Sequence, residues 1–293
     1  MSPPRAKVSA ITDEFSNEFD EVVEYLAGRG VDHVELRKVW AVDVAYLMDD
    51  MCADAKDVLD QFGVRVSCIS GSLLKCVPPG SPEEKPGEQA PSRNLEYNLS
   101  LADRYVELAE FFGAPYLRCF GFQRGGPGGP PEEETWQTWA DSVRAVLEKL
   151  RGKPVTLVCE NEAGCTIRDL PSIQMAFGLV RDPQFKLLLD PANLRHAGQV
   201  LDDGTFEALR DLVGYVHAKD GRADQATGKV VTTVVGEGDS DLPKHFRALL
   251  DDGYDSFFSV ETHLGGKGEE KWNNSVRALD ALLDVLRGLG AWD

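Results

Sequence analysis

Eight short apolar segments, each followed by a longer amphipathic stretch, constrain this 293-residue chain more than any other feature. The segments are rich in β-branched and aromatic residues, as buried strands are, and the stretches carry apolar residues three and four positions apart, as helices do. The predicted strands are 8–11, 33–36, 65–69, 116–120, 155–159, 186–189, 215–218 and 257–260. Strict alternation builds parallel sheet through right-handed crossovers, and eight units close into a barrel. We therefore predict an α/β fold, a single-domain (β/α)8 barrel.

The helical stretches are best marked at 18–27, 44–62, 95–112, 135–150 and 271–286. Glycines stand where helices are expected to end, at Gly28, Gly63, Gly113, Gly152 and Gly288. A doubly wound open sheet is the rival architecture. It is disfavoured because the first strand leads into Thr12-Asp13-Glu14-Phe15 and lacks a glycine-rich phosphate loop.

The charge of the chain limits its partners. Thirty-one basic and 49 acidic residues give a net charge of -18, which repels phosphate backbones and anionic lipid surfaces. We therefore expect no nucleic acid and no membrane partner. No apolar run approaches the roughly 20 residues that a membrane helix needs, and the first residues lack a signal-peptide pattern, so a cytoplasmic location is expected. The six cysteines form no C-x-x-C pair and are expected to be reduced and mostly buried.

Three long connections follow predicted strands, at 76–92, 121–131 and 221–239. Connections on that side of a barrel surround the active site, so we interpret them as lid-like loops, with mobile surface loops as the alternative. The third contains a run of Val and Thr residues at 230–235 that indicates a small extra hairpin.

Polar residues end the last four predicted strands: Glu160, Asp190, His217 and Glu261. Taken singly, each is more often a cap or an ion-pair partner. Together, they lie at neighbouring strand ends, where barrels place their chemistry. Three carboxylates converging on one buried site repel each other unless a cation neutralises them. We therefore predict one divalent metal ion, Mn²⁺ or Mg²⁺, with Zn²⁺, Co²⁺ or Fe²⁺ as alternatives.

With these residues in view, the whole chain resembles the sugar phosphate isomerase/epimerase family, the xylose isomerase-like TIM barrels. The resemblance rests on the motifs Gly30-Val31-Asp32-His33-Val34-Glu35-Leu36-Arg37, Glu160-Asn161-Glu162, Asp190-Pro191-Ala192-Asn193, His217-Ala218-Lys219-Asp220, Gly236-Glu237-Gly238-Asp239 and Glu261-Thr262-His263. It implies a xylose isomerase-like TIM barrel domain over 1–293 and a divalent cation on Glu160, Asp190, His217 and Glu261. It also implies a small-molecule carbohydrate substrate and a homo-oligomer, dimer or tetramer.

The chemistry common to this family is proton transfer at a carbon next to a carbonyl, through an enediolate. We therefore expect a metal-dependent isomerase or epimerase acting on a sugar, a sugar acid or a polyol ketone. Glu160 and Glu261 are the expected acid–base residues, with Glu162 in reserve. Lys219 is expected to bind a substrate carbonyl or phosphate, or to neutralise Glu162.

Further side chains near the strand ends are candidates for substrate binding. They are Asn193, Arg222, Lys75, Arg118 and Trp40, for which surface ion pairs or a buried aromatic are the alternative interpretations. Gly236 and Gly238 fit either a phosphate-binding turn or a tight turn before a helix. Asn193 stands where ketose 3-epimerases and endonuclease IV commonly carry a histidine ligand.

Other functions fit the same fold. The runner-up is a metal-dependent lyase that dehydrates a cyclic ketone or cleaves a 3-keto-glycoside. A carbohydrate-binding barrel without turnover is a third hypothesis, and nuclease action on abasic DNA is a fourth that the acidic charge disfavours.

Overall fold

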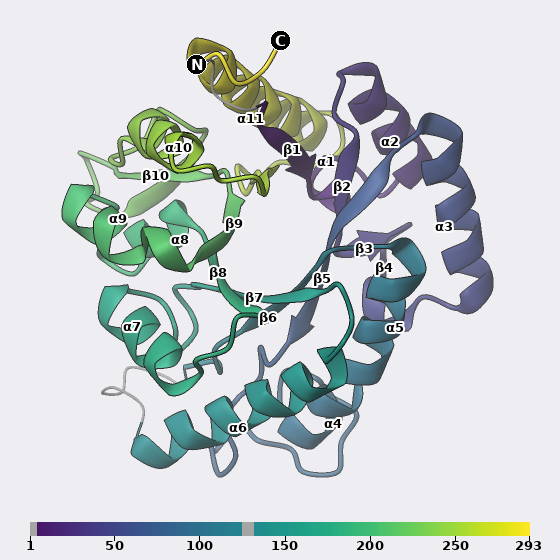
Figure 1. The fold of residues 1–293 in the computed structure, drawn as a ribbon, viewed down its shortest axis with the longest axis vertical. Helices are drawn as coiled ribbons and strands as arrows, with labels where there is room; N and C mark the ends of the chain where they lie inside the picture. Colours follow the sequence, from purple (N-terminus) through teal and green to yellow (C-terminus); the bar gives the residue numbers. More distant parts are fainter. Residues whose placement is uncertain (1–4, 125–131) are drawn as a thin grey trace.

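Eight parallel strands form the centre of the computed structural model, which describes residues 5–124 and 132–293 (Figure 1). Their order around the sheet is β1, β12, β9, β8, β7, β6, β5, β2. The strands β1 and β2 stand at the two ends of this order. A parallel bridge between Ile11, directly after β1, and Glu35 in β2 joins these two ends. The predicted (β/α)8 barrel of one domain is confirmed.

All eight predicted strands are present in the barrel. They are β1 (Lys7–Ala10), β2 (His33–Leu36), β5 (Arg65–Leu73), β6 (Tyr116–Phe120), β7 (Thr156–Glu160), β8 (Phe185–Leu189), β9 (Val213–His217) and β12 (Phe257–Val260). The largest difference is at β5, which runs four residues past its predicted end. The extension begins with Ser70, Gly71 and Ser72, which are small and do not continue the apolar run, so the pattern did not predict it.

Helices surround the barrel (Figure 1). The longer ones are α2 (Phe19–Gly28), α3 (Asp49–Phe62), α5 (Ala102–Phe112), α6 (Glu133–Leu150), α7 (Leu170–Leu179), α10 (Leu242–Asp251) and α11 (Glu269–Gly288). The shorter ones are α1 (Thr12–Phe15), α4 (Leu95–Ser100), α8 (Pro191–His196), α9 (Asp203–Leu209) and the 3-10 turns η1 (Val44–Tyr46) and η2 (Arg210–Leu212). Among the described residues, we find no helix long and apolar enough to cross a bilayer.

Two predicted helices are interrupted. The stretch 44–62 contains η1, then an extended turn at Leu47 and Met48, and only then α3. The stretch 95–112 divides into α4 and α5 at Leu101. Apolar periodicity continues across both breaks because the segments on either side pack on the same core, so the pattern alone could not reveal them.

The glycine predictions are correct at two helix ends. Gly63 and Gly113 adopt the left-handed conformation that ends α3 and α5. Gly28 and Gly288 instead are the last residues of their helices, and the left-handed residues lie two positions later, at Gly30 and Gly290. Gly152 is left-handed but follows the capping residue Arg151.

Alternation along the strands fills the inside of the barrel in layers. Every second residue points inward, and Cys68, Val158, Leu188, Tyr215 and Phe257 form an apolar cluster there, separate from the core under the helices. The next inward residue on each of four strands is polar, and these residues are Glu160, Asp190, His217 and Ser259. The apolar layer therefore supports a buried polar layer above it.

The long connections differ in structure. The third contains the predicted hairpin, in which β10 (Asp220–Ala223) pairs antiparallel with β11 (Val230–Thr233). The first, 76–92, consists of turns, and residues 125–131 of the second lie outside the described residues. A further hairpin, formed by β3 (Lys38–Val39) and β4 (Val42–Asp43), was not predicted, because its two-residue strands contain no apolar run. All six cysteines are free and buried, as predicted.

Candidate metal centre

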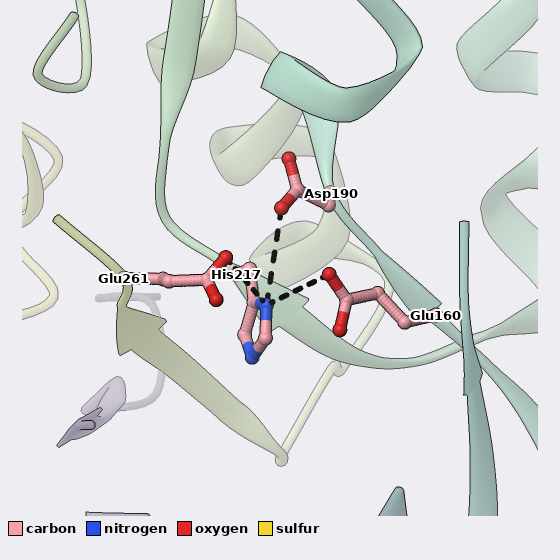
Figure 2. Close-up of side chains that lie close together, drawn as sticks. All are labelled: Glu160, Asp190, His217 and Glu261. Carbon is pink, nitrogen blue, oxygen red and sulfur yellow. Dashed lines mark ion pairs between the residues drawn. The ribbon is translucent and has the colours of Figure 1, made fainter. Parts of the chain in front are cut away.

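Four side chains from neighbouring strand ends converge inside the barrel. Glu160 ends β7, Asp190 follows β8, His217 ends β9 and Glu261 follows β12, and none is more than 3% exposed. Figure 2 shows the three carboxylates around one imidazole nitrogen. From His217 Nδ1, the distance is 3.3 Å to Glu261 Oε2, 3.7 Å to Glu160 Oε1 and 3.9 Å to Asp190 Oδ2. One ligand atom from each residue lies within 4.8 Å of the others.

The donor set fits a divalent cation. His217 Nδ1 is buried and has no hydrogen-bond partner, although buried polar atoms nearly always have one. It faces three carboxylates, which are the hard oxygen ligands that Mg²⁺ and Mn²⁺ prefer. A metal ion on these four atoms would supply the missing partner and neutralise the carboxylates.

The close approach of the three carboxylates shifts the pKa values of Asp190 and His217. Burial raises the pKa of Asp190, and the charges of Glu261 and Glu160 raise it further against the pull of Lys219 and His217, to about 7. Burial lowers the pKa of His217, but the charges of Glu35, Glu261 and Glu160 reverse this and raise it well above its ordinary value. Without a cation, the cluster therefore takes up protons, as expected for converging carboxylates.

Two buried cations flank the cluster. Arg118 Nη1 donates to Glu160 Oε2 at 3.0 Å, and another guanidinium nitrogen donates to the carbonyl of Ser70. Lys219 Nζ lies 2.5 Å from Glu261 Oε2 and 2.8 Å from Asp190 Oδ2. Burial alone would raise the pKa of Glu261, but Lys219 and His217 hold it well below its ordinary value.

Asn193 holds two of the carboxylates. Its Nδ2 donates to Glu160 Oε1 and to Asp190 Oδ2, each at 3.0 Å. Asp190 in turn caps α8 by accepting the backbone N–H of Asn193 at 2.8 Å. The motif Asp-Pro-Ala-Asn therefore orients two carboxylates of the cluster from the first turn of a helix.

The remaining predicted site residues lie farther out. Lys75 pairs with Glu162 at 2.7 Å, so Lys75 and not Lys219 neutralises that carboxylate. Trp40 packs on Phe19 and donates to Asp20. Arg222 is exposed on β10. Within the described residues, the contacts of Trp40 and Arg222 do not reach the four-residue cluster.

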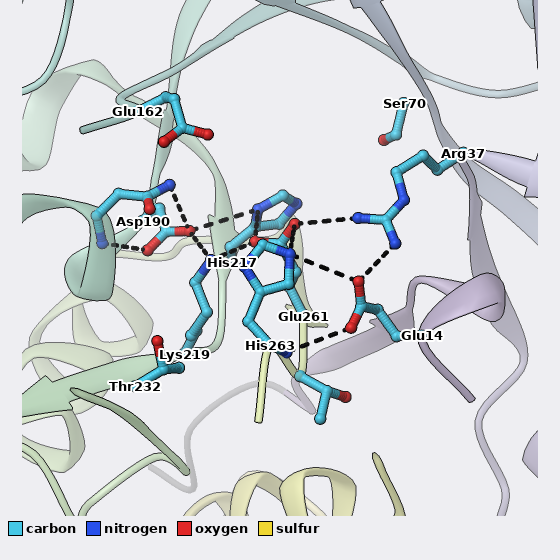
Figure 3. A network of polar contacts seen from close by, with 12 residues as sticks. Glu14, Arg37, Ser70, Glu162, Asp190, His217, Lys219, Thr232, Glu261 and His263 are labelled. Atoms are coloured by element: carbon cyan, nitrogen blue, oxygen red, sulfur yellow. Dashed lines mark hydrogen bonds and ion pairs between the residues drawn. The ribbon is translucent and has the colours of Figure 1, made fainter. Parts of the chain in front are cut away.

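Sequence reasoning missed a second polar group at the ends of β1 and β2. Arg37 forms ion pairs with Asp13 at 2.8 Å and Glu14 at 2.5 Å, and its Nη1 lies 3.6 Å from Glu261 Oε1. His263 lies between Glu14 and Lys219 (Figure 3). The rule that polar residues after strands mark the site would have found Glu14 and Arg37, had it been applied to the first two strands.

The turn containing Gly236 and Gly238 holds a carboxylate of the chain itself. Asp220 accepts the backbone N–H groups of Gly236 at 3.3 Å and of Gly238 at 3.1 Å. These donors are therefore already occupied, which favours the tight-turn interpretation over phosphate binding.

Comparison with known proteins agrees with the barrel fold. The sequence model of a family described as xylose isomerase-like TIM barrel matches residues 23–282. An inosose dehydratase of Clostridium perfringens is 26% identical over 145 residues, which cover 44% of this chain and 48% of that protein. The chain thus spans about half the length of this curated relative.

Solved structures resemble the whole chain. A xylose isomerase-like TIM barrel protein from Mycobacterium smegmatis in complex with magnesium has a TM-score of 0.72 at 19% identity, over 96% of this chain and 98% of that one. A D-allulose 3-epimerase from Methylomonas sp. has a TM-score of 0.68 at 15% identity, over 98% of this chain and 100% of that one. At such identities, the likeness concerns the fold.

Proposed function

This chain belongs to the xylose isomerase-like TIM barrel family, and from that premise we propose that it is a divalent-metal-dependent isomerase or epimerase of sugars, sugar acids or polyol ketones. The observation that carries the proposal is the cluster of Glu160, Asp190 and Glu261 around the unpartnered Nδ1 of His217. Such a cluster at the carboxyl ends of barrel strands lies where enzymes of this architecture carry out their chemistry.

Mn²⁺ or Mg²⁺ is the proposed ion, because three of the four ligands are carboxylates. When bound, it supplies Lewis-acid stabilisation for negative charge that develops on a substrate carbonyl oxygen. The magnesium complex of the Mycobacterium smegmatis protein supports this choice.

The chain's own residues divide the remaining work. Lys219 is buried and protonated, since the charges of Asp190 and Glu261 raise its pKa above its ordinary value despite burial. It can donate a hydrogen bond to the oxygen that gains charge as the proton leaves carbon. Its three N–H bonds already serve Asp190, Glu261 and His263, so a substrate oxygen would replace one of these partners.

Proton transfer at carbon needs a carboxylate that reaches the mouth of the barrel. Both oxygens of Glu160 already accept hydrogen bonds, one from Asn193 and one from Arg118. Burial alone would raise the pKa of Glu160, but the positive charges of His217 and Arg118 lower it below its ordinary value. Glu162 is more accessible, with 22% of its side chain exposed. Its Oε2 accepts from Lys75 at 2.7 Å, so the carboxylate is ionised and a substrate would approach it beside that ion pair. We therefore propose that Glu162 removes and returns the substrate proton, and that Glu160 and Glu261 serve chiefly as metal ligands.

A lyase is the second candidate, favoured by the similarity to inosose dehydratase. Dehydration of a cyclic ketone also begins with removal of a proton next to a carbonyl, and the leaving hydroxyl then needs a proton donor. The same groups serve both reactions, and the fate of the carbanion decides between them.

The test is to incubate the Mn²⁺-loaded protein with ketoses and keto-cyclitols in D₂O. Deuterium uptake next to the carbonyl without loss of water supports the isomerase or epimerase, and a new enone absorbance supports the dehydratase. Ligand-dependent thermal stabilisation with neither reaction would indicate a carbohydrate-binding barrel and would overturn the proposal. The Glu261→Gln variant is the control for a contaminating enzyme.

A further inference from the structure

A carboxylate that takes no part in the proposed chemistry lies beneath the cluster. Glu35, on β2, is fully buried and reaches across the barrel to His217 on β9. Its Oε1 lies 3.2 Å from His217 Nε2, on the side of the ring opposite the three carboxylate ligands. Glu35 is absent from both sets of described side chains that could hold a metal ion, which are Glu160, Asp190, His217 and Glu261 and, beside them, Glu14, Glu261 and His263.

Four groups hold Glu35 in place. Ser259 Oγ donates to Oε2 at 2.7 Å and Tyr215 OH donates to Oε2 at 3.0 Å. The Ser70 hydroxyl and His217 Nε2 share Oε1. Among the described residues, the one ion pair of Glu35 is with His217. The carboxylate is thus fixed in orientation, and the imidazole is its one charged neighbour within ion-pair distance.

The two ring nitrogens therefore differ in their surroundings. An ionised carboxylate only accepts hydrogen bonds, so the nitrogen that faces Glu35 must carry the proton. A histidine that binds a metal ion is neutral and has one N–H, so in the metal-bound protein the lone pair is left on Nδ1, the nitrogen that faces Glu160, Asp190 and Glu261. The Glu35 contact thus selects the tautomer that presents a ligand atom to a cation.

We propose that Glu35 is a positioning residue, which holds the proton of His217 on Nε2, fixes the ring, and so makes Nδ1 a metal ligand. This inference rests on the proposed metal site, because a positioned Nδ1 has a purpose only if a cation is bound. The negative charge of Glu35 also makes the imidazole a stronger donor toward that cation.

The test uses two variants and a matched control. Glu35→Gln keeps the shape and one acceptor oxygen but removes the charge, whereas Glu35→Met removes the acceptor altogether. Tyr215→Phe is the control, since it takes one hydrogen bond from Glu35 in the same buried layer and leaves the contact with His217 intact. Circular dichroism and thermal unfolding establish that each variant is folded.

Two readouts are needed, and neither is activity. Mn²⁺ affinity from calorimetry is expected to fall about 10–100-fold in Glu35→Gln and further in Glu35→Met, and much less in Tyr215→Phe. In ¹⁵N-histidine-labelled protein with Mg²⁺, the His217 Nε2–H resonance is expected to be downfield and protected from exchange, and to be lost in Glu35→Met.

The outcomes separate the two proposals. If the unaltered protein shows the protected Nε2–H resonance but binds no metal, the proposed function fails and the role of Glu35 in fixing the ring stands. If it binds metal and folded Glu35→Met binds it equally well, with the proton on Nδ1 or an unchanged Nε2–H signal, the inference about Glu35 is overturned. Should Glu35→Met not fold, Glu35→Gln decides alone, and unaltered affinity there contradicts the inference.

Discussion

Arg118 shows how a single buried cation supports the candidate site. It is 4% exposed and pairs with Glu160 at 3.0 Å. Replacing one partner of a buried ion pair leaves the other charge uncompensated, which costs about 3–5 kcal/mol. We expect Arg118→Met to lower the free energy of unfolding of the metal-free protein by that amount, measured by denaturant titration.

Metal provides the control for Arg118. A bound cation replaces part of the lost positive charge beside Glu160, so saturating Mn²⁺ should stabilise Arg118→Met more than it stabilises the unaltered protein. Equal stabilisation of both proteins would argue that Glu160 and the metal do not interact.

Glu162 is the carboxylate to which we assign proton transfer. As the proposed proton carrier, it contributes to turnover and not to the metal set. We expect Glu162→Gln to lower kcat about 10²–10⁴-fold, the usual contribution of general acid–base catalysis, while Mn²⁺ affinity measured by calorimetry stays close to that of the unaltered protein. Full activity in this variant would return the proton transfer to Glu160 or Glu261.

At the level of single residues, the sequence singled out the four proposed ligands because each comes at the end of an apolar strand, and the structure brings their side chains together. Glu35 was not singled out because it lies inside a strand, and its partner His217 is 182 positions away, a pairing that only the closed barrel creates. The roles of Asn193 and Arg118 as partners of Glu160 likewise depend on side-chain directions that spacing alone does not give.

Among the structural elements, the loop between β11 and α10 depends on a close approach of backbone to side chain. A Cβ on Gly238 would collide with the Asp220 carboxylate, which also accepts backbone N–H groups of that loop. Gly238→Ala should therefore lower the free energy of unfolding by about 1–3 kcal/mol, as overpacking does, when measured by denaturant titration.

Gly178 on α7 is the matched control for Gly238. A Cβ there meets nothing within 4 Å, so Gly178→Ala should stabilise the protein by about 0.5–1 kcal/mol through helix propensity. A Gly238→Ala protein as stable as the unaltered one would show that the loop does not rest on Asp220.

The packing of α9 against α10 predicts a pH dependence. His245 is buried and stacked on Phe206, with ring centroids 4.6 Å apart. Burial lowers its pKa below 6.5, against the opposing charges of Asp203 and Asp241. The folded state thus favours the neutral ring, so this stabilisation is present above the unfolded-state pKa near 6.5 and is lost as pH falls below it.

His245→Phe removes this titration and keeps the aromatic contact. Neither ring nitrogen of His245 has a hydrogen-bond partner, so the substitution breaks no buried hydrogen bond and removes only the long contact, 3.5 Å, between Nε2 and the exposed carboxylate of Asp203. Denaturant titrations at pH 7 and pH 5 should show the unaltered protein losing more stability than His245→Phe over that interval. Equal losses would mean that the pKa of His245 is the same in the folded and unfolded states.

Elements were predicted best where burial is two-sided. The barrel strands stand out as apolar runs because helices cover one face and the barrel interior the other. The short helices α1 and α8 carry polar residues that face the site, so their composition resembles that of loops. The polar residues that make these short elements hard to predict are the same residues that contribute polar groups to the candidate site.

At the level of the whole molecule, the barrel brings four distant segments together. The order β7, β8, β9, β12 makes the four strands that carry the proposed ligands consecutive neighbours in the sheet, and the apolar layer beneath them fixes the height of these side chains. The expectation of a dimer or tetramer stays a prediction, which light scattering of the purified protein measures directly.

We expect one divalent ion to bind to the four converging side chains. Calorimetric titration of metal-stripped protein with Mn²⁺ tests it most directly, with Glu261→Gln as the ligand variant and exposed Glu96→Gln as its control. We expect one ion per chain in the unaltered and Glu96→Gln proteins and strongly weakened binding in Glu261→Gln. Absence of binding by the folded, unaltered protein, or equal affinity in Glu261→Gln, would contradict it.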